Sequence, residues 1–193
     1  MKIIRIPAGM LGTNFYILSD EASAESAVID PGGDAEKLIS AIEKSGTKVK
    51  YILLTHGHFD HTGAVTDLKK KYNVPVCINR EDYDMIKSGI SELYTIKDDD
   101  GKIYNFIDDG STFHLGNMVI STIATPGHTP GGVCFYVENI LISGDTLFEG
   151  SVGRTDFPGA DHDTLINSIK TKLMGLPEDT IVLPGHGGET TIG

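Results

Sequence analysis

The sequence predicts a single domain of the mixed α/β class. Two observations lead to this class. Apolar runs of strand length alternate with segments of helical period over residues 27–78, and strand-length runs follow one another from residue 113 onward. The length of 193 residues and the apolar content of 39% allow one hydrophobic core. We therefore expect one α/β domain that spans residues 1–193.

The first 30 residues have the pattern of an antiparallel meander. Three short apolar runs, at 3–6, 15–18 and 27–30, are separated by Gly/Asn or acidic turns and are predicted strands. A helix is expected next, because apolar residues then recur on one face. Asp34 is the expected N-cap of this helix, and Gly46 its end.

The alternation continues through the middle of the chain. Residues 51–54 are a predicted strand, a helix is expected from about Gly63, and residues 74–78 form the next strand. The apolar residues of 82–109 do not recur with a clear helix or strand period. We expect a short helix and a loop here that cover one side of the functional site described below. The acidic run Asp98–Asp100 lacks the alternating ligands and the later Glu of a calcium loop, so it is predicted to be a solvated turn.

The second half is dominated by strands. Tight turns separate the first of them. The predicted strands are 113–115, 118–124, 133–137, 140–143 and 181–183. A glycine-rich loop at 149–159 precedes a helix that Asp161 caps and that runs to about Leu173.

Charge and composition limit the class of partner. The net charge of -11 argues against nucleic acid or an anionic membrane, because both need a basic surface, and leaves a small molecule as the expected partner. No signal peptide opens the chain and no apolar run approaches the length of a membrane span, so we expect a cytoplasmic protein. Cys77 and Cys134 lie within apolar runs and are expected to be buried thiols.

The stretch Thr55–His61 places four potential metal ligands directly after a predicted strand. Its pattern is His-x-His-x-Asp-His, and side chains at a strand end are exposed but rigidly anchored. His56 and His58 alternate and can converge on one ion, whereas Asp60 and His61 lie beyond the turn and point toward a second. Imidazole and carboxylate together suit zinc, iron or manganese rather than calcium or magnesium.

Three further candidates share this local design. His128, Asp145 and His186 each follow a short apolar strand and lie among glycines. Strand ends that deliver His or Asp to one sheet edge would build a common site. The two remaining histidines, His114 in a predicted strand and His162 at a helix start, need no such role.

With its ligands in this order, the chain resembles the metallo-β-lactamase superfamily and, within it, the glyoxalase II-like hydrolases. The match runs from the Asp30-Pro31-Gly32-Gly33 turn to Pro184-Gly185-His186, and five separated segments agree in type and order. The resemblance implies an αβ/βα four-layer sandwich, in which two mixed β-sheets lie face to face with helices outside. It also implies that the site lies along one edge.

The resemblance implies a role for each candidate. It assigns His56, His58 and His128 to a first metal, Asp60, His61 and His186 to a second, and Asp145 to a bridge between them. Two divalent ions, expected to be zinc with iron or manganese as alternatives, would hold a hydroxide between them, because coordination lowers the pKa of water toward ~7. Asp60 would act as a catalytic residue by orienting this hydroxide. Asp30 is expected either to orient a ligand or only to form the turn before Pro31.

The chain departs from true glyoxalase II at the substrate pocket. That enzyme has a helical region after the last metal histidine that binds glutathione, whereas this chain ends seven residues past His186. Arg154 occupies the position of a basic residue that faces a glutathione carboxylate, but Gly188 and Asp156 replace residues used for the same ligand. Arg154 is therefore expected either to bind substrate or to form an ion pair with Asp156 or Asp161.

We expect a metal-dependent hydrolase of a thioester such as S-lactoylglutathione, similar to hydroxyacylglutathione hydrolases. Asp145 stands where the main zinc β-lactamases have Cys, which argues against antibiotic hydrolysis. The alternative is a persulfide dioxygenase of the same superfamily, with one iron held by His56, His128 and Asp145. That enzyme shares the run at 153–157 but has Arg-Gly-Cys in place of Gly150-Ser151-Val152. A nuclease would need a basic surface, which this chain lacks.

Overall fold

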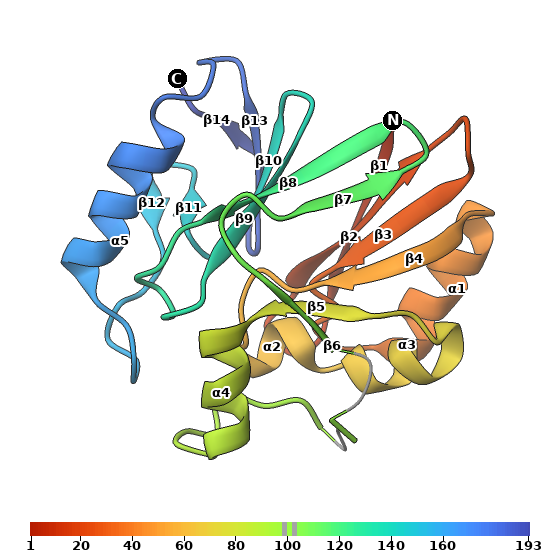
Figure 1. Cartoon of the computed structure of the whole chain (residues 1–193), viewed down its shortest axis with the longest axis horizontal. Helices are drawn as coiled ribbons and strands as arrows, with labels where there is room; N and C mark the ends of the chain where they lie inside the picture. Colours follow the sequence, from red (N-terminus) through yellow and green to blue (C-terminus); the bar gives the residue numbers. More distant parts are fainter. Residues whose placement is uncertain (98–99, 102–103) are drawn as a thin grey trace.

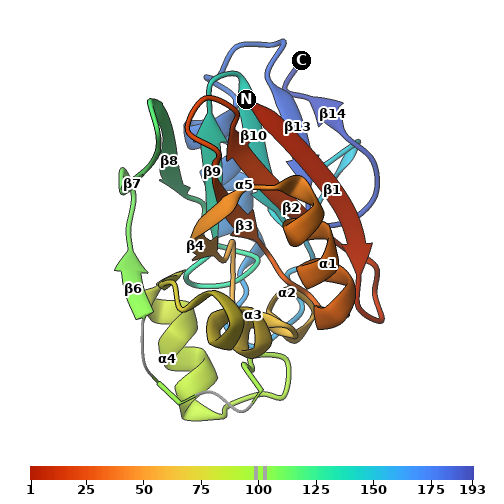
Figure 2. The same ribbon diagram turned by 90° about the vertical axis from the view of Figure 1, so that its right-hand side faces the viewer.

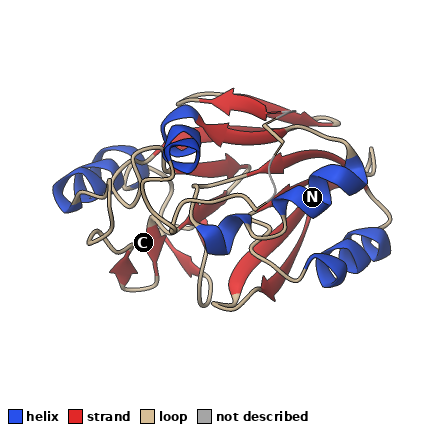
Figure 3. Cartoon of the chain, turned by 90° about the horizontal axis from the view of Figure 1, so that it is seen from below, coloured by secondary structure: helices blue, strands red, loops and turns tan. Residues whose placement is uncertain are grey.

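The structure is a computed structural model and describes residues 1–97, 100–101 and 104–193. Within these residues two six-stranded sheets face each other, and helices cover their outer faces (Figure 1). Seen from below, helices lie to the left and to the right of the strands (Figure 3). The fold is the αβ/βα sandwich that the resemblance implies, so the expected fold class is confirmed.

The first sheet is built by the amino-terminal half and has its strands in chain order. Its strands are β1 (Lys2–Ala8), β2 (Thr13–Asp20), β3 (Glu25–Ile29), β4 (Lys48–Leu53), β5 (Val76–Asn79) and β6 (Tyr104–Ile107). The first three pair antiparallel, as the predicted meander requires, and β3 to β6 are parallel. Parallel neighbours need crossover connections, and here these contain helices.

Four helices belong to this half. They are α1 (Ala35–Ser45), α2 (Phe59–Thr62), α3 (Val65–Tyr72) and α4 (Arg80–Ser88). The amphipathic α1 and α3 bury their apolar stripes against the sheet, where Leu38 and Leu68 are fully buried beside Ile52. The first of them ends at Gly46, which adopts the left-handed conformation that favours glycine.

The second sheet is built by the carboxyl-terminal half. Its strands, in spatial order, are β14 (Thr190–Thr191), β13 (Ile181–Pro184), β10 (Ile140–Gly144), β9 (Val133–Val137), β8 (Met118–Ala124) and β7 (Thr112–Leu115). The four consecutive strands from β7 to β10 pair antiparallel, each with the next. The strand β13 pairs parallel with β10. The crossover to β13 contains the hairpin of β11 (Leu147–Phe148) and β12 (Ser151–Val152), and the helix α5 (His162–Ser168), which continues as a π-helical turn, Ile169–Leu173.

Apolar side chains fill the space between the sheets and the space under the helices. Leu53 and Phe135 from opposite sheets meet in the central layer, and Leu165 of α5 packs against the second sheet with Leu141. Cys77 and Cys134 are both buried and free, as expected. Among the described residues, no helix has the length and apolar character needed to cross a bilayer.

Several elements differ in detail from the prediction. The helix α4 begins at Arg80 because Asn79 caps it by accepting a hydrogen bond from the Glu81 amide. The strand β6 was not predicted, because it lies in the segment without a clean period and forms only by pairing with β5. Asp34 precedes α1, but its carboxylate accepts from the Gly9 amide and does not cap the helix. In the predicted turn and its flank, Asp98, Asp99 and Ile103 lie outside the described residues.

The strand directions place many strand ends together. The strands β8, β10 and β13 run the same way, because β8 and β10 are both antiparallel to β9. Their carboxyl ends meet those of β3 and β4 across the two sheets, where the Val133 amide donates to the Thr55 carbonyl and the Asn14 amide donates to the Gly185 carbonyl. Figure 2 shows both termini at the opposite end of the molecule from α2 and α4.

Candidate metal centre

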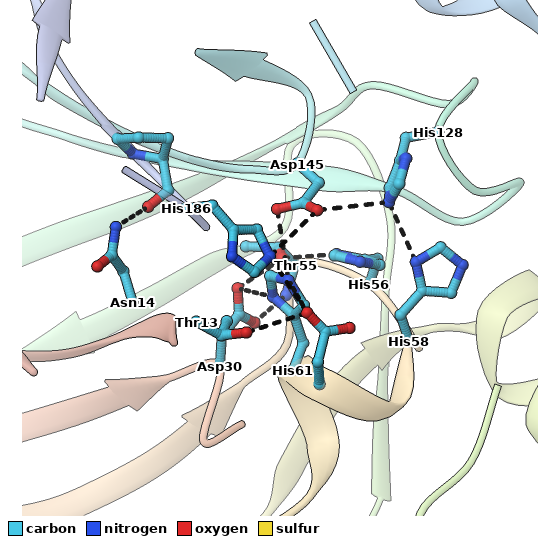
Figure 4. A network of polar contacts seen from close by, with 12 residues as sticks. Thr13, Asn14, Asp30, Thr55, His56, His58, His61, His128, Asp145 and His186 are labelled. Atoms are coloured by element: carbon cyan, nitrogen blue, oxygen red, sulfur yellow. Dashed lines mark hydrogen bonds and ion pairs between the residues drawn. The ribbon is translucent and has the colours of Figure 1, made fainter. Parts of the chain in front are cut away.

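All seven predicted ligands meet at this edge of the sandwich (Figure 4). They form three overlapping groups, and within each group the potential ligand atoms lie within 4.8 Å of one another. The groups are His56, His58 and His128; His56, His61 and Asp145; and Asp60, His61 and His186. The structure therefore brings together every ligand candidate that the strand-end pattern predicted. His114, which lies on β7, and His162, which begins α5, belong to none of these groups.

Hydrogen bonds fix the orientation of two rings in the first set. The Thr55 hydroxyl donates to Asp30, so Nδ1 of His56, at 3.0 Å from the same hydroxyl oxygen, is the donor to it. In His128, Nδ1 lies 2.7 Å from the Arg154 carbonyl oxygen and must carry the proton. Nε2 of each ring is left with its lone pair directed into the site. Such outer partners fix the tautomer of a ligating histidine.

The second set has the same organisation. Nδ1 of His61 donates to Oδ2 of Asp30 at 2.9 Å, which leaves its Nε2 directed into the site. Oδ2 of Asp60 lies 3.1 Å from Nε2 of His186 and accepts a hydrogen bond of 3.0 Å from the Thr13 hydroxyl. Thr13 begins β2, and because β2 runs antiparallel to β3, its first residues lie at the same edge as the carboxyl ends of β3 and β4.

Asp145 lies between the two sets. Its Oδ1 is 3.4 Å from Nε2 of His61, while its Oδ2 is 3.7 Å from Nε2 of His128 and 3.6 Å from Nε2 of His186. A glycine follows β13 because the backbone there comes very close: a Cβ at Gly185 would lie 2.2 Å from Oδ1 of Asp145. This carboxylate can therefore reach a group bound by either set.

The first set is held in its neutral form. Burial, together with the neighbouring His61 and His58, lowers the pKa of His56 well below its usual value. Burial also lowers the pKa of His58 to about 3, and it lowers the pKa of His128 despite the attraction of Asp145. Neutral imidazole is the form that binds metal, so this set is ready to coordinate at neutral pH.

In the second set, the pKa values of the two histidines are raised and the pKa of the aspartate is lowered. Burial acts to lower the pKa of His61, but the carboxylates of Asp145 and Asp30 outweigh it and raise this pKa well above the usual value. The hydrogen bond to Asp60 likewise raises the pKa of His186. Burial acts to raise the pKa of Asp60, but His186 and His61 bring it well below its usual range. The Asp60 carboxylate is therefore ionised and can offset the charge of a cation.

The residues fit a bound metal. Among the described residues, Nε2 of His56, Nε2 of His61 and Oδ1 of Asp145 are buried in the site without a hydrogen-bond partner, and Nδ1 of His58 lies 3.1 Å from Nε2 of His128. A buried polar atom without a partner costs about 1–3 kcal/mol. Several such atoms directed into one small space would be unfavourable unless a cation coordinated them. The mixture of imidazole and carboxylate suits zinc, iron or manganese.

Asp30 orients ligands of both sets. Its carboxylate accepts from the Thr55 amide at 2.8 Å and from the Thr55 hydroxyl at 2.6 Å, in addition to His61. Its backbone has a φ of +51°, a left-handed conformation that is strained for a residue with a side chain. This strained conformation places the carboxylate within hydrogen-bond distance of His61. Asp30 therefore orients a ligand candidate as well as forming the turn before Pro31.

Asp82 is the residue of the site that the sequence did not reveal. It is fully buried in the first turn of α4, and its carboxylate accepts from the Gly57 amide at 2.7 Å, the Thr129 hydroxyl at 2.9 Å and the Gly131 amide at 2.7 Å. Gly57 lies between His56 and His58, and Thr129 follows His128. The Asp82 carboxylate is therefore hydrogen-bonded to both loops that carry the histidines of the first set. Burial raises its pKa to about 6.

A cavity of about 290 Å³ adjoins the ligands. Arg154 lines it and makes two hydrogen bonds to Asp156, at 3.0 Å and 2.8 Å, while its guanidinium lies 4.4 Å from the centre of the Phe157 ring. The expected ion pair with Asp156 is therefore present. Two thirds of each of these two charged side chains are exposed, so the pair is accessible from the cavity and from solvent.

The sequence pattern of the metallo-beta-lactamase superfamily matches residues 8–186 of this chain, a segment that contains all seven ligand candidates. The chain belongs to the metallo-β-lactamase superfamily. Two relatives cover its whole length. It is 37% identical to "Probable metallo-hydrolase YqgX" of Bacillus subtilis and 38% identical to "Hydroxyacylglutathione hydrolase GloC" of Haemophilus influenzae, and it spans 93% and 94% of these proteins. The chain is therefore a metal-dependent hydrolase of this superfamily.

Solved structures of superfamily members have the same fold. The crystal structure of the BLEG-1 B3 metallo-beta-lactamase is 37% identical and superposes with a TM-score of 0.88, over 100% of this chain and 95% of that one. TTHA1623, solved in a di-iron-bound form, is 34% identical with a TM-score of 0.83, over 98% and 95%. The shared fold extends over the complete sandwich.

Proposed function

We propose that this metallohydrolase binds two metal ions and hydrolyses a thioester of the S-lactoylglutathione type. The observation that carries the proposal is the position of Asp145 between two ligand sets, next to a cavity. Structural zinc sites are closed by four protein ligands, whereas catalytic sites keep positions open for water and substrate. The similarity to a protein named hydroxyacylglutathione hydrolase supports the thioester as substrate.

The seven side chains would divide between two ions. His56, His58 and His128 would hold the first ion, Asp60, His61 and His186 the second, and Asp145 would contact both. Zinc is our first choice, with iron or manganese as alternatives. Ions bound there would supply a hydroxide nucleophile and would polarise the substrate carbonyl.

Asp60 is the proposed catalytic residue of the chain. The Thr13 hydroxyl and His186 hold its carboxylate, and its low pKa keeps it ionised over the neutral range. It faces the cavity, where it can accept a hydrogen bond from the attacking water and orient its lone pair toward the carbonyl. Its role is to position the nucleophile.

The surroundings favour a good leaving group. Among the described residues that line the cavity, Ser151 and Arg154 are the polar side chains outside the ligand sets, and neither ionises near pH 7. A thiol, with an ordinary pKa near 8.5, can leave as the thiolate and needs no proton from the enzyme. An amine or alkoxide leaving group would need one, so this cavity is better suited to a thioester. We assign Arg154 to an anionic part of the substrate.

The test is hydrolysis of S-lactoylglutathione by the protein as isolated, after chelation, and after reloading with zinc or iron. We expect turnover that chelation abolishes and that zinc restores at two ions per chain. A β-lactam substrate tests the reaction named for the BLEG-1 relative, and we expect slower turnover of it. One iron per chain with oxygen uptake on a persulfide would replace this proposal with the dioxygenase alternative.

A further inference from the structure

The cavity beside the ligands is predominantly apolar. Six of its lining residues are aliphatic or aromatic, and they come from the β11–β12 hairpin, from α2 and from the loops between elements. They are Leu11, Phe59, Leu93, Phe148, Val152 and Phe157. The other lining residues are five of the metal-ligand candidates, Ser151 and Arg154. A substrate therefore meets apolar walls as soon as it extends beyond the reacting carbonyl.

The cavity lining has few charged side chains that could bind a charged group of a substrate. Within the described part of the lining, Arg154 is the single basic side chain outside the histidines, and it is already paired with Asp156 by two hydrogen bonds. A substrate carboxylate would have to compete with Asp156 for the guanidinium. Glutathione carries two carboxylates and an ammonium group, so its full recognition would need more polar partners than these residues provide.

The rim of the cavity exposes apolar surface that a substrate can cover. The β1–β2 turn presents Leu11, which is 56% exposed and lines the cavity, beside Met10, which is 94% exposed. Exposed apolar side chains that border a cleft are typical of ligand-binding sites. Burying them against an apolar group would be favourable, whereas burying them against a hydroxyl group would not. A cavity of about 290 Å³ is also at the small end of the range for ligand sites.

We propose that the preferred substrate of this site is a thioester with an apolar, branched or aromatic acyl group and no more than one negative charge. The inference rests on the proposed thioester hydrolysis and ranks S-lactoylglutathione below thioesters of this kind as a substrate. The apolar walls bind the acyl group, the carbonyl lies at the ligands, and Arg154 accepts the single anion when one is present. The polar lactoyl group leaves these walls uncovered.

The test is a series of acyl thioesters of one neutral thiol, N-acetylcysteamine, assayed with the zinc-loaded protein. The acyl groups are acetyl, D-lactoyl, isovaleryl and phenylacetyl. We expect kcat/KM to rise about fourfold for each methylene that becomes buried, so that isovaleryl and phenylacetyl exceed acetyl by at least tenfold. A flat series, or one in which lactoyl is the best substrate, would overturn the inference and leave the proposed thioester hydrolysis standing.

Two variants and a matched control locate the effect. Leu11→Ser changes an exposed turn residue and should lower kcat/KM for phenylacetyl several-fold more than it lowers kcat/KM for acetyl. Phe148→Ala, on β11, should have the same effect. Val119→Ser introduces the same polarity at a 42% exposed position on β8 outside the cavity and should change neither substrate. Equal losses for acetyl and phenylacetyl in both cavity variants would contradict an acyl-binding role for these walls.

A binding measurement separates failure of this inference from failure of the proposed reaction. Calorimetry with phenylacetate and with lactate measures the preference of the zinc-loaded site without turnover. If no thioester is hydrolysed and phenylacetate still binds at least tenfold more tightly, the proposed reaction is wrong and the apolar site stands. If no thioester is hydrolysed and the two acids bind equally, both proposals are wrong.

Discussion

Replacing Asp82 tests whether a buried carboxylate outside the ligand sets controls the first of them. Asp82→Ala would leave three buried donors, on Gly57, Thr129 and Gly131, without their acceptor. Each buried donor without a partner costs about 1–3 kcal/mol, so we expect a loss of unfolding free energy of roughly 3 kcal/mol or more. Asp82→Asn keeps one acceptor oxygen but directs an N–H toward a donor, and should cost about 1–3 kcal/mol.

The more specific effect is on metal binding. The donors to Asp82 flank His56, His58 and His128, so the variant Asp82→Asn should lower the affinity of the first site by about 10–100-fold, as loss of an orienting partner does. Chelator competition with cobalt measures the two affinities, and thermal unfolding of the metal-free protein measures stability. Asp84→Asn, an exposed position on the same helix, is the control. Wild-type affinity of the first site in Asp82→Asn would refute the reasoning, whatever its stability.

Three further predictions concern pH, the cavity and the backbone. Between pH 8 and 5.5 dialysis should remove the second metal before the first, because the raised pKa values of His61 and His186 let protons compete there, whereas His58 stays neutral down to its pKa of about 3; metal analysis at each pH would show the order. Arg154→Ala should raise KM for an anionic thioester more than it lowers kcat, because the residue binds the substrate equally in the ground state and the transition state. Steady-state kinetics measure both constants, and a larger fall in kcat than rise in KM would show that the residue is only structural. Gly185→Ala should lower metal affinity at least tenfold and cost about 1–3 kcal/mol, since its Cβ would collide with the shared carboxylate; calorimetric zinc titration and thermal unfolding measure both losses, and wild-type values would contradict the steric account.

The sequence predicted which ligand candidates lie together because their signal is local. His56, His58, His128 and His186 each follow an apolar strand beside glycines, and the carboxyl ends of similarly directed strands meet at one edge whatever the details of packing. The resemblance implied the proposed division into two sets and the proposed bridging role of Asp145. The α/β class followed from the same alternation of strand and helix.

The features that were missed depend on contacts between distant segments. Asp82 looks like an ordinary acidic residue in the first turn of a helix, and only the folded chain places it under the loops of Gly57 and Gly131. Thr13 is likewise 47 residues from its partner Asp60. The strand β6 exists because β5 offers it an edge, which no local period reports. Tertiary contacts of this kind leave no pattern in a single sequence.

The central claim is that seven side chains hold two metal ions on either side of Asp145. Anomalous diffraction from crystals of the zinc-loaded protein tests it most directly. The account predicts two peaks, one against His56, His58 and His128 and one against Asp60, His61 and His186, both in contact with Asp145. A single peak at full zinc occupancy, or a second peak outside this cluster, would contradict the claim.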